Sequence, residues 1–361
     1  LYKIPKIRNS NNMLIKEGVA YLYIDNNTFQ NGWTLSKNNI TSKTSIPGFT
    51  LAPIYDDKNS TNLFWLLYND QPPNESVHFN YGHTKGVFVS NENEGFWLIH
   101  SVPNFPPQPN NGDIINKSRT KRNKNVKHTK AKQLVVGEYA YPSTGKLNGQ
   151  SFLCISTNKT NFNTIGKQLM YNEIIVYKKN IPNYCLSQYS TLVDAAHQVH
   201  ITNGSYNNKV NIYSKSGEKF TSFAKNSKWG KDLYDDFIAP QLNTDLYTET
   251  WLNGRGRLPS DCHRSKVLNI QSITLPVAQI QFKNTHDHSK WAASVESNDK
   301  NSWVCVGDIN RASTQFERGG GSVCLNLPQV WKAYKNSVDN IEPCPIRNFK
   351  YYLDQTKAWF G

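Results

Sequence analysis

Apolar residues alternate with polar ones, or run together in short blocks, along most of the chain, and this pattern is typical of β-strands. Three segments instead repeat apolar residues at roughly helical spacing, at 162–171, 227–242 and 327–338. Strands mixed with helices predict an α/β or α+β fold. The strand-like stretches are AYLYID (20–25), NLFWLLYND (62–70), TKGVFVS (84–90), GFWLIHSV (95–102), QSFLCIS (150–156), KVNIYS (209–214), LYTETWL (246–252), KVLNIQSITL (266–275) and SWVCVGDI (302–309).

Two strand-like stretches are entered by the same pair of basic residues, a histidine and a lysine two positions apart. His83 and Lys85 begin one apolar run, and His288 and Lys290 precede another. Side chains at i and i+2 point the same way from a strand, so each pair projects together. A third H-x-K, at His128–Lys130, has no strand after it, and we interpret it as a chance occurrence.

The neighbourhoods of the two pairs are also alike. Each pair is followed by an apolar strand and then by a turn that contains an asparagine, in WLIHSVPNF (97–105) and in WVCVGDINR (303–311). This repetition predicts a duplicated architecture whose halves, 1–175 and 176–361, meet at one composite active site.

Two imidazoles and two ammonium groups around one point suit a phosphodiester. One histidine can attack phosphorus while the other protonates the departing oxygen. The lysines can stabilise the charge that builds on the non-bridging oxygens. This chemistry needs no metal or other cofactor, and the sequence contains no carboxylate cluster or metal-spaced His/Cys set.

Composition narrows the class of partner. The chain has 361 residues, of which 37% are hydrophobic, enough for a large core. Its mean hydropathy is −0.63 and no apolar run approaches a membrane span, so we expect no membrane insertion. The net charge of +14 indicates a polyanion as partner, which on charge alone is a nucleic acid, an anionic membrane or a glycan.

One segment, RTKRNKNVKHTKAK (119–132), is almost entirely basic and polar. We expect a solvated, mobile insertion loop there, within a longer insertion at about 108–149. Contact with a polyanion and proteolytic processing are the alternatives.

Cysteine usage and sequons indicate a secretory route. Six cysteines without a C-x-x-C pair favour disulfides. No signal peptide is visible in the first residues, and we expect that a leader has been removed. We therefore expect a lysosomal or secreted protein. Seven N-x-[S/T] sequons fit this route: Asn26, Asn39, Asn59, Asn74, Asn116, Asn158 and Asn203.

The motif blocks resemble one known family. The sequence is similar to the deoxyribonuclease II family, including its plancitoxin-like branch, a relative of the phospholipase D superfamily. The resemblance implies an α/β fold with a phospholipase D-like pseudo-twofold duplication, in which helices flank two mixed sheets. It spans nearly the whole chain, and its most specific blocks are GHTKG (82–86), FWLIHSVPNFPP (96–107), DHSKW (287–291) and RGGGSVC (318–324).

The same resemblance implies an activity. Family members are acid endonucleases that cut double-stranded DNA without a divalent metal and leave 3′-phosphate and 5′-hydroxyl ends. By analogy with the superfamily, one histidine forms a phosphohistidine and the other acts as acid and then as base. We assign the nucleophile to His83 and the general acid to His288, with Lys85 and Lys290 beside them; the reverse assignment uses the same groups.

Further residues take roles through the resemblance. His100 matches a family histidine, either in the chemistry or in orienting its turn. Asn104 and Asn310 are candidate phosphate contacts. The resemblance also implies a homodimer.

Two disulfides, Cys262–Cys344 and Cys305–Cys324, are implied by the same resemblance. The family partner expected for Cys154 is absent, and Cys185 is extra. A Cys154–Cys185 bridge is therefore one candidate.

An acid pH optimum follows from the two histidines. A free histidine titrates near ~6.5, and the mechanism needs one neutral ring and one protonated ring. Two alternatives to the nuclease remain at this point. One is a secreted, catalytically weak or inactive relative that binds DNA or modulates a host, and the other is an enzyme acting on phospholipid head groups.

Overall fold

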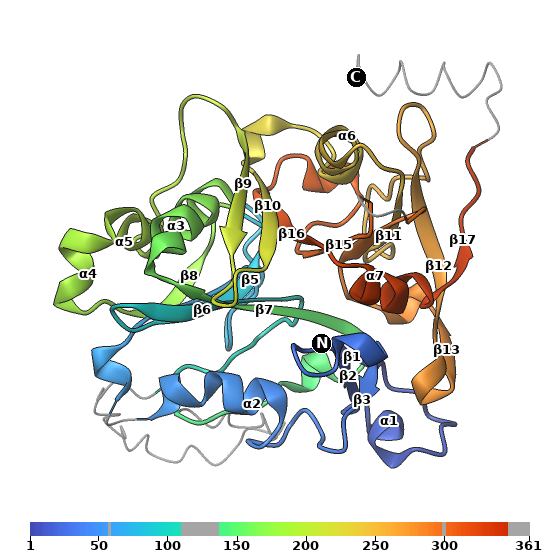
Figure 1. Ribbon diagram of the computed structural model, residues 1–361, viewed down its shortest axis with the longest axis horizontal. Coiled ribbons are helices and arrows are strands. Elements are labelled where there is room, and N and C mark those ends of the chain that lie inside the picture. Colours follow the sequence, from blue (N-terminus) through green and yellow to red (C-terminus); the bar gives the residue numbers. More distant parts are fainter. Residues whose placement is uncertain (57–58, 110–136, 298–300, 346–361) are drawn as a thin grey trace, which may run out of the picture.

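The strands form two large sheets with helices packed around them (Figure 1). The computed structural model describes residues 1–56, 59–109, 137–297 and 301–345. The prediction of an α/β protein is therefore confirmed. The basic segment 119–132, which includes His128–Lys130, lies outside the described residues.

The first sheet is antiparallel at every pairing of its strands. The expectation of two mixed sheets is therefore wrong for this sheet. The short turn 91–93 joins β5 and β6, and a hairpin connection makes neighbours antiparallel. A longer connection, 70–84, joins β4 to β5. Its strands, in spatial order, are β3 (Thr34–Leu35), β2 (Tyr21–Tyr23), β1 (Tyr2–Lys3), β7 (Gln150–Asn158), β6 (Glu94–His100), β5 (Lys85–Ser90), β4 (Phe64–Asn69) and β8 (Val176–Asn180).

The second sheet is mixed, because β11 and β12 run parallel while its other pairs are antiparallel. An additional strand, β17 (Val338–Ile341), pairs with β12. The remaining strands, in spatial order, are β13 (Ile280–Lys283), β12 (Val267–Leu275), β11 (Leu246–Glu249), β14 (Trp291–Ser294), β15 (Trp303–Gly307), β16 (Gly320–Asn326), β10 (Lys219–Lys225) and β9 (Asn207–Tyr213).

The largest hydrophobic cluster takes side chains from both sheets, so the sheets share one core. Strand alternation separates this core from the outer faces. On β6, for example, Trp97 and Ile99 enter the shared core, whereas Leu98 faces a second cluster on the other side of the first sheet. A third cluster covers the outer face of the second sheet and contains Cys305.

Two of the three predicted helices are confirmed. The segment 162–171 is α3 (Phe162–Tyr171), and 327–338 contains α7 (Pro328–Lys335). Both contribute buried residues to the shared core. The other α-helices of the described residues are α1 (Met13–Glu17), α2 (Ile46–Leu51), α4 (Asn183–Gln188), α5 (Ser190–Ala196) and α6 (Ala239–Leu242).

The third predicted helix, 227–242, is interrupted. Gly230 adopts a left-handed conformation (φ 69°), which ends the first short turn. The Asp232 carboxylate then accepts hydrogen bonds from the backbone N–H of Tyr234 (2.9 Å) and Asp235 (2.7 Å). It thereby begins a π-helical turn, Tyr234–Ile238, which leads into α6.

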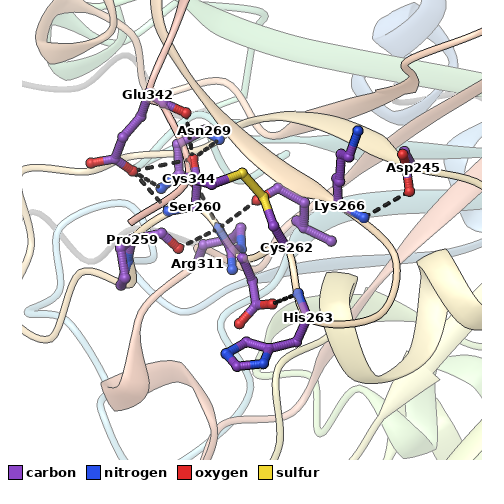
Figure 2. Close-up of a disulfide and its surroundings, with 12 residues drawn as sticks. Asp245, Pro259, Ser260, Cys262, His263, Lys266, Asn269, Arg311, Glu342 and Cys344 are labelled. Atoms are coloured by element: carbon purple, nitrogen blue, oxygen red, sulfur yellow. Dashed lines mark hydrogen bonds between the residues drawn. A yellow bond between two sulfur atoms is a disulfide. The ribbon is translucent and has the colours of Figure 1, made fainter. Parts of the chain in front are cut away.

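Both disulfides implied by the resemblance are present, Cys262–Cys344 and Cys305–Cys324. Figure 2 shows the first of them beside a polar network. Glu342 accepts hydrogen bonds from Ser260 N (2.9 Å) and Asn269 Nδ2 (2.7 Å). Asn269 Oδ1 accepts one from the buried Arg311 (2.8 Å). The bridge therefore fastens the last described segment to the connection between β11 and β12.

The candidate Cys154–Cys185 bridge is wrong, because both thiols are free. Cys154 lies on β7 two residues from Phe152, whose side chain faces the outer cluster of the first sheet. Cys185 lies on α4 and packs into the shared core. Since i and i+2 share a strand face, the two sulfurs are on opposite sides of the sheet.

The sequons fall mostly on the surface. Of those within the described residues, Asn39 is half-buried and the others are exposed, namely Asn26, Asn59, Asn74, Asn158 and Asn203. Asn116 lies outside the described residues. No helix in the described part of the chain is long and apolar enough to span a bilayer.

Candidate active site

A cavity of about 510 Å³ brings together the two H-x-K histidines, which are far apart in the sequence. His83 precedes β5 and His288 precedes β14. The structure therefore brings the two predicted histidines, which belong to different sheets, to one cavity. The cavity is lined by Asp70, Gln71, Val77, Phe79, His83, Lys85, Pro103, Arg255, His288, Thr314, Gln315, Glu317 and Arg318.

His83 is held by residues of the second sheet. Its backbone N–H donates to the Gly319 carbonyl (2.9 Å), and its ring Nδ1 lies 2.7 Å from the Asp308 carbonyl oxygen. A carbonyl oxygen only accepts, so Nδ1 carries the proton. The neutral ring then has its lone pair on Nε2.

His288 is held in the same manner by residues of the first sheet. Its backbone N–H donates to the Gly149 carbonyl (2.9 Å), and Nδ1 lies 3.0 Å from the Ser101 carbonyl oxygen. Gln150 Oε1 is a second acceptor at 3.2 Å. Nδ1 again carries the proton, so both rings have the same tautomer and each depends on the opposite sheet.

Lys85 belongs to a buried cluster of charges. Its Nζ contacts the Asp70 carboxylate, which also accepts a hydrogen bond from Arg318 Nη2 (3.2 Å). The second oxygen of Asp70 lies 4.0 Å from His83 Nε2. One carboxylate is thus shared by two cations and lies close to Nε2 of one histidine.

Lys290 has a different environment. Its Nζ donates to the His288 carbonyl (2.7 Å), and its backbone N–H donates to Ser151 Oγ (3.2 Å). Burial lowers the pKa of Lys290 well below its ordinary value, and the charge of Lys85 lowers it further. Within the described residues, no carboxylate forms an ion pair with this ammonium group, so its pKa is sensitive to an anion bound nearby.

Both imidazoles are biased toward the neutral form. Burial lowers the pKa of His83 well below 6.5, and the charges of Lys85 and Arg318 lower it further. Burial also lowers the pKa of His288, followed by the charges of Lys290 and Lys85. A phosphate anion placed among these cations would offset their effect and favour protonation.

Nearby carboxyls have raised pKa values and are likewise biased toward the neutral form. Burial raises the pKa of Asp308 to about 8, although Lys85 opposes this effect. Burial also raises the pKa of Glu249 well above 4.5. Asp287 is buried beside His288, where it accepts from the Tyr2 hydroxyl and from the Ser289 N–H (2.9 Å).

The other predicted site residues lie near the cavity but do not line it. His100 is fully buried against Phe105 and Phe152, and its Nδ1 accepts from the Val102 N–H (3.1 Å). This contact favours the role of orienting the turn over a role in the chemistry. Its Nε2 is buried and has no hydrogen-bond partner among the residues that the structure describes.

The two predicted asparagines hold turns. Asn104 has a positive φ of 58° and donates from Nδ2 to the Pro72 carbonyl (2.8 Å). Asn310 Oδ1 accepts from the Trp251 N–H (3.2 Å). Phosphate contacts by these asparagines stay a prediction.

Sequence reasoning did not assign several residues that shape the site. Asp70 and Arg318 are the main ones, together with Trp251, whose ring packs edge-on against His288 at 5.3 Å between centroids. Asp70 had a signal, since it is a carboxylate at the end of the apolar run NLFWLLYND. Arg318 is 248 positions away from Asp70, and no local pattern links the two.

In the described residues, no group of three or more His, Cys, Asp or Glu side chains is placed to hold a metal ion. The chemistry that the arrangement itself provides is nucleophilic and acid–base, from two imidazoles, with cations beside them to bind an anion.

Comparison with known proteins gives a consistent result. Residues 1–344 match the family model of deoxyribonuclease II. The chain is 37% identical to Plancitoxin-1 of Acanthaster planci, over 95% of this chain and 88% of the relative. It is 35% identical to Deoxyribonuclease-2-alpha of Mus musculus, over 95% and 89%. It is 33% identical to Deoxyribonuclease-2-beta of Homo sapiens, over 95% and 87%. The chain therefore belongs to the deoxyribonuclease II family.

Proposed function

We propose that the protein is an acid endodeoxyribonuclease that hydrolyses DNA phosphodiester bonds without a metal, leaving 3′-phosphate and 5′-hydroxyl ends. The observation that carries this proposal is that His83 and His288 line one cavity, each with Nδ1 hydrogen-bonded to a backbone carbonyl. The names of the relatives, deoxyribonucleases among them, support DNA as the substrate.

The reaction has two steps. Nε2 of one neutral imidazole attacks phosphorus, and the bond from phosphorus to the 5′ oxygen breaks. The other histidine, as imidazolium, gives its proton to that oxygen, and the product is a 5′-hydroxyl fragment. The now neutral second ring takes a proton from water, which attacks the phosphohistidine. The phosphorus–nitrogen bond breaks, and the other fragment leaves with a 3′-phosphate.

We assign the attack to His83 and the proton transfer to His288. Their Nδ1 contacts are alike, so the reversed assignment would use the same hydrogen bonds. Mapping the phosphorylated residue by mass spectrometry after rapid acid-free quenching distinguishes the two. A phosphoryl group on His288 would reverse our assignment.

The lysines bind the phosphate in this proposal. Lys85 and Lys290 stabilise the charge on the non-bridging oxygens as the pentavalent transition state forms. Lys85 is held in place by Asp70, whereas Lys290 is held through its own Nζ contact with the His288 carbonyl.

We also propose that the fold is a phospholipase D-like duplication with halves 1–175 and 176–361. In each sheet the H-x-K strand lies between an earlier strand and the strand that follows it, β4–β5–β6 in one and β11–β14–β15 in the other. The reciprocal carbonyl contacts of the two histidines support the same twofold relation. One strand departs from this division: β8 follows the proposed boundary, yet it pairs with β4 of the first sheet.

An acid optimum fits the lowered histidine pKa values. Falling pH supplies the imidazolium that the first step needs, and the excess of basic residues favours a polyanion. We propose a lysosomal or secreted location, with exposed sequons as glycan sites. A homodimer stays a prediction.

Digestion of supercoiled plasmid at acid pH in the presence of EDTA tests the proposal. We expect the wild-type protein to nick and linearise the plasmid, and end-group analysis to find 3′-phosphates. His83→Ala and His288→Ala should each lose about 10³-fold or more of the rate. A folded wild-type protein that retards DNA in a gel without cutting it would contradict the nuclease and favour the DNA-binding alternative. Head-group release from phospholipid would favour the lipid alternative.

A further inference from the structure

An exposed aromatic ring lies at the edge of the cavity that holds the histidines. Phe79 lines this cavity and is 73% exposed, and the half-buried Val77 lines it as well. A phenyl ring in water beside charged groups contributes little to folding stability. Phe49 on α2 is similarly exposed, at 65%, but does not line the cavity.

The segment that carries Phe79 is anchored on both sides. Before the ring, the His78 N–H donates to the Asp70 carbonyl (2.8 Å), and the His78 carbonyl accepts from Arg318 Nη2 (2.9 Å). After it, the Tyr81 carbonyl accepts from Arg318 Nε (2.9 Å). Arg318 is itself only 6% exposed. The ring is therefore presented to solvent by backbone that a buried arginine holds in place.

The same anchor also holds the catalytic lysine. Arg318 donates to Asp70, and Asp70 contacts Lys85 Nζ. Phe79 and the proposed phosphate-binding group are thus positioned by one charge cluster. A ring carried by anchored backbone needs less ordering of its segment when it binds a flat partner.

We propose that Phe79 stacks on the nucleobase of a nucleotide that adjoins the scissile phosphate. This inference rests on the proposed function, because a phosphate between the histidines brings its neighbouring nucleosides to the cavity edge. The base is the flat, apolar face that such a substrate offers to an aromatic ring. Every base has such a face, so the contact strengthens binding without reading sequence.

In a regular duplex the faces of each base are covered by its neighbours. The contact therefore requires a base that has left the stack, and unstacking a base costs free energy. We expect Phe79 to contribute more on single-stranded DNA than on a paired duplex.

Dinucleotides with a single phosphodiester test the contact directly. We compare thymidine dinucleotides with analogues that are abasic on one side or the other, using wild type, Phe79→Ala and the matched control Phe49→Ala. For wild type and the control, removing the stacked base should raise KM about tenfold. Phe79→Ala should show this tenfold rise already on the intact dinucleotide and no further rise on the abasic analogue. Phe79→Trp should restore the wild-type pattern.

A second measurement does not depend on cleavage. Binding of a labelled oligothymidylate and of its abasic counterpart is followed by fluorescence anisotropy in a His288→Ala background. The preference for the base-containing strand should fall about tenfold when Phe79→Ala is added. If removing the base weakens wild type and Phe79→Ala equally, in KM or in binding, the inference is overturned. Loss of cleavage with the stacking preference intact would instead count against the proposed function alone.

Discussion

The surroundings of His83 and of His288 are alike in backbone contacts and unlike in side chains. Each ring has Nδ1 on a carbonyl of the opposite sheet. At Nε2, however, His83 has Asp70 at 4.0 Å, whereas the ring of His288 packs against Trp251. Asp70 directly follows β4, and Trp251 lies just beyond β11, so the two residues come from the strands that neighbour β5 and β14.

The comparison teaches that ring geometry and ring electrostatics have separate origins. Backbone carbonyls set the tautomer and orientation, and these are equal on the two sides. The lysine of each motif places a positive charge near its ring on both sides, and the difference between the sides comes from Asp70 and Trp251, which lie outside the motif. Two identical motifs are therefore compatible with different roles for their histidines.

Among substitutions outside the H-x-K pairs, removing the carboxylate on the His83 side should lower stability and kcat the most. Asp70→Asn leaves Lys85 and Arg318 without their shared anion in a buried site, so we expect unfolding free energy to fall by about 3 kcal/mol. We also expect kcat to fall about 10²-fold because Lys85 loses its position. Chemical denaturation and plasmid cleavage measure the two effects. The surface pair Lys215–Glu94 offers a control, and Glu94→Gln should change stability by less than about 1 kcal/mol. Equal effects of the two substitutions would contradict a special role for Asp70.

A second substitution tests the buried acid next to His83. The pKa of Asp308 is about 8 in the folded protein against 3.8 ordinarily, so between these values the folded state binds a proton that the unfolded state does not. Its contribution to stability is therefore present below pH ~4 and is lost as pH rises through about 8.

Asp308→Asn removes this titration while keeping an oxygen for the Lys85 N–H. The difference in unfolding free energy between wild type and variant should change by about 1 kcal/mol per pH unit between pH 5 and 7, in favour of wild type at the lower pH. Urea titrations across this range measure it. A difference that stays constant with pH would mean that Asp308 is ionised in the folded protein.

The pH dependence of kcat/KM reports histidine pKa values in the free protein, whereas that of kcat reports them in the substrate complex. The histidine pKa values lie below 6.5 in the free protein, so kcat/KM should decline with rising pH at a midpoint below 6.5. A bound phosphate offsets the nearby cations, and the midpoint for kcat should lie about one pH unit higher. Coincident midpoints in steady-state kinetics would show that the substrate does not change the charge balance.

The smallest effect is expected on the His288 side. Trp251→Phe keeps an aromatic ring beside His288 and leaves the backbone N–H that donates to Asn310. We expect kcat to fall about threefold, since edge contacts between rings contribute about 1 kcal/mol. Single-turnover cleavage measures this. A loss of kcat as large as that of Asp70→Asn would show that neighbouring side chains affect His288 as strongly as His83.

Local patterns predicted the parts of the fold that local chemistry determines. The apolar runs became strands, and helical spacing at 162–171 became α3. The helix predicted over 227–242 failed because Gly230 and Asp232 end and begin turns within it. The Cys154–Cys185 bridge failed because sequence does not reveal which face of a sheet a helix covers.

For the site, too, the sequence predicted what local motifs determine and missed what long-range contacts determine. The H-x-K pairs were visible as motifs, and the resemblance that they carry was confirmed by the family match. Asp70 and Arg318 were not assigned, because their significance depends on contacts across 248 positions. For His100 the sequence left open a role in the chemistry or in orienting its turn, and its burial between two phenylalanines favours the second.

The hydroxyl of Tyr2, in the first strand of the chain, contacts Asp287 beside the second H-x-K histidine. Together with the contacts of His83 to Asp308 and of His288 to Ser101, it ties the reactive groups to distant parts of the polypeptide. A ribosome-bound chain lacking its last third has neither the second imidazole nor the carbonyl that orients the first. In the proposed mechanism, a chain truncated before these residues therefore cannot assemble the site and should not cut DNA.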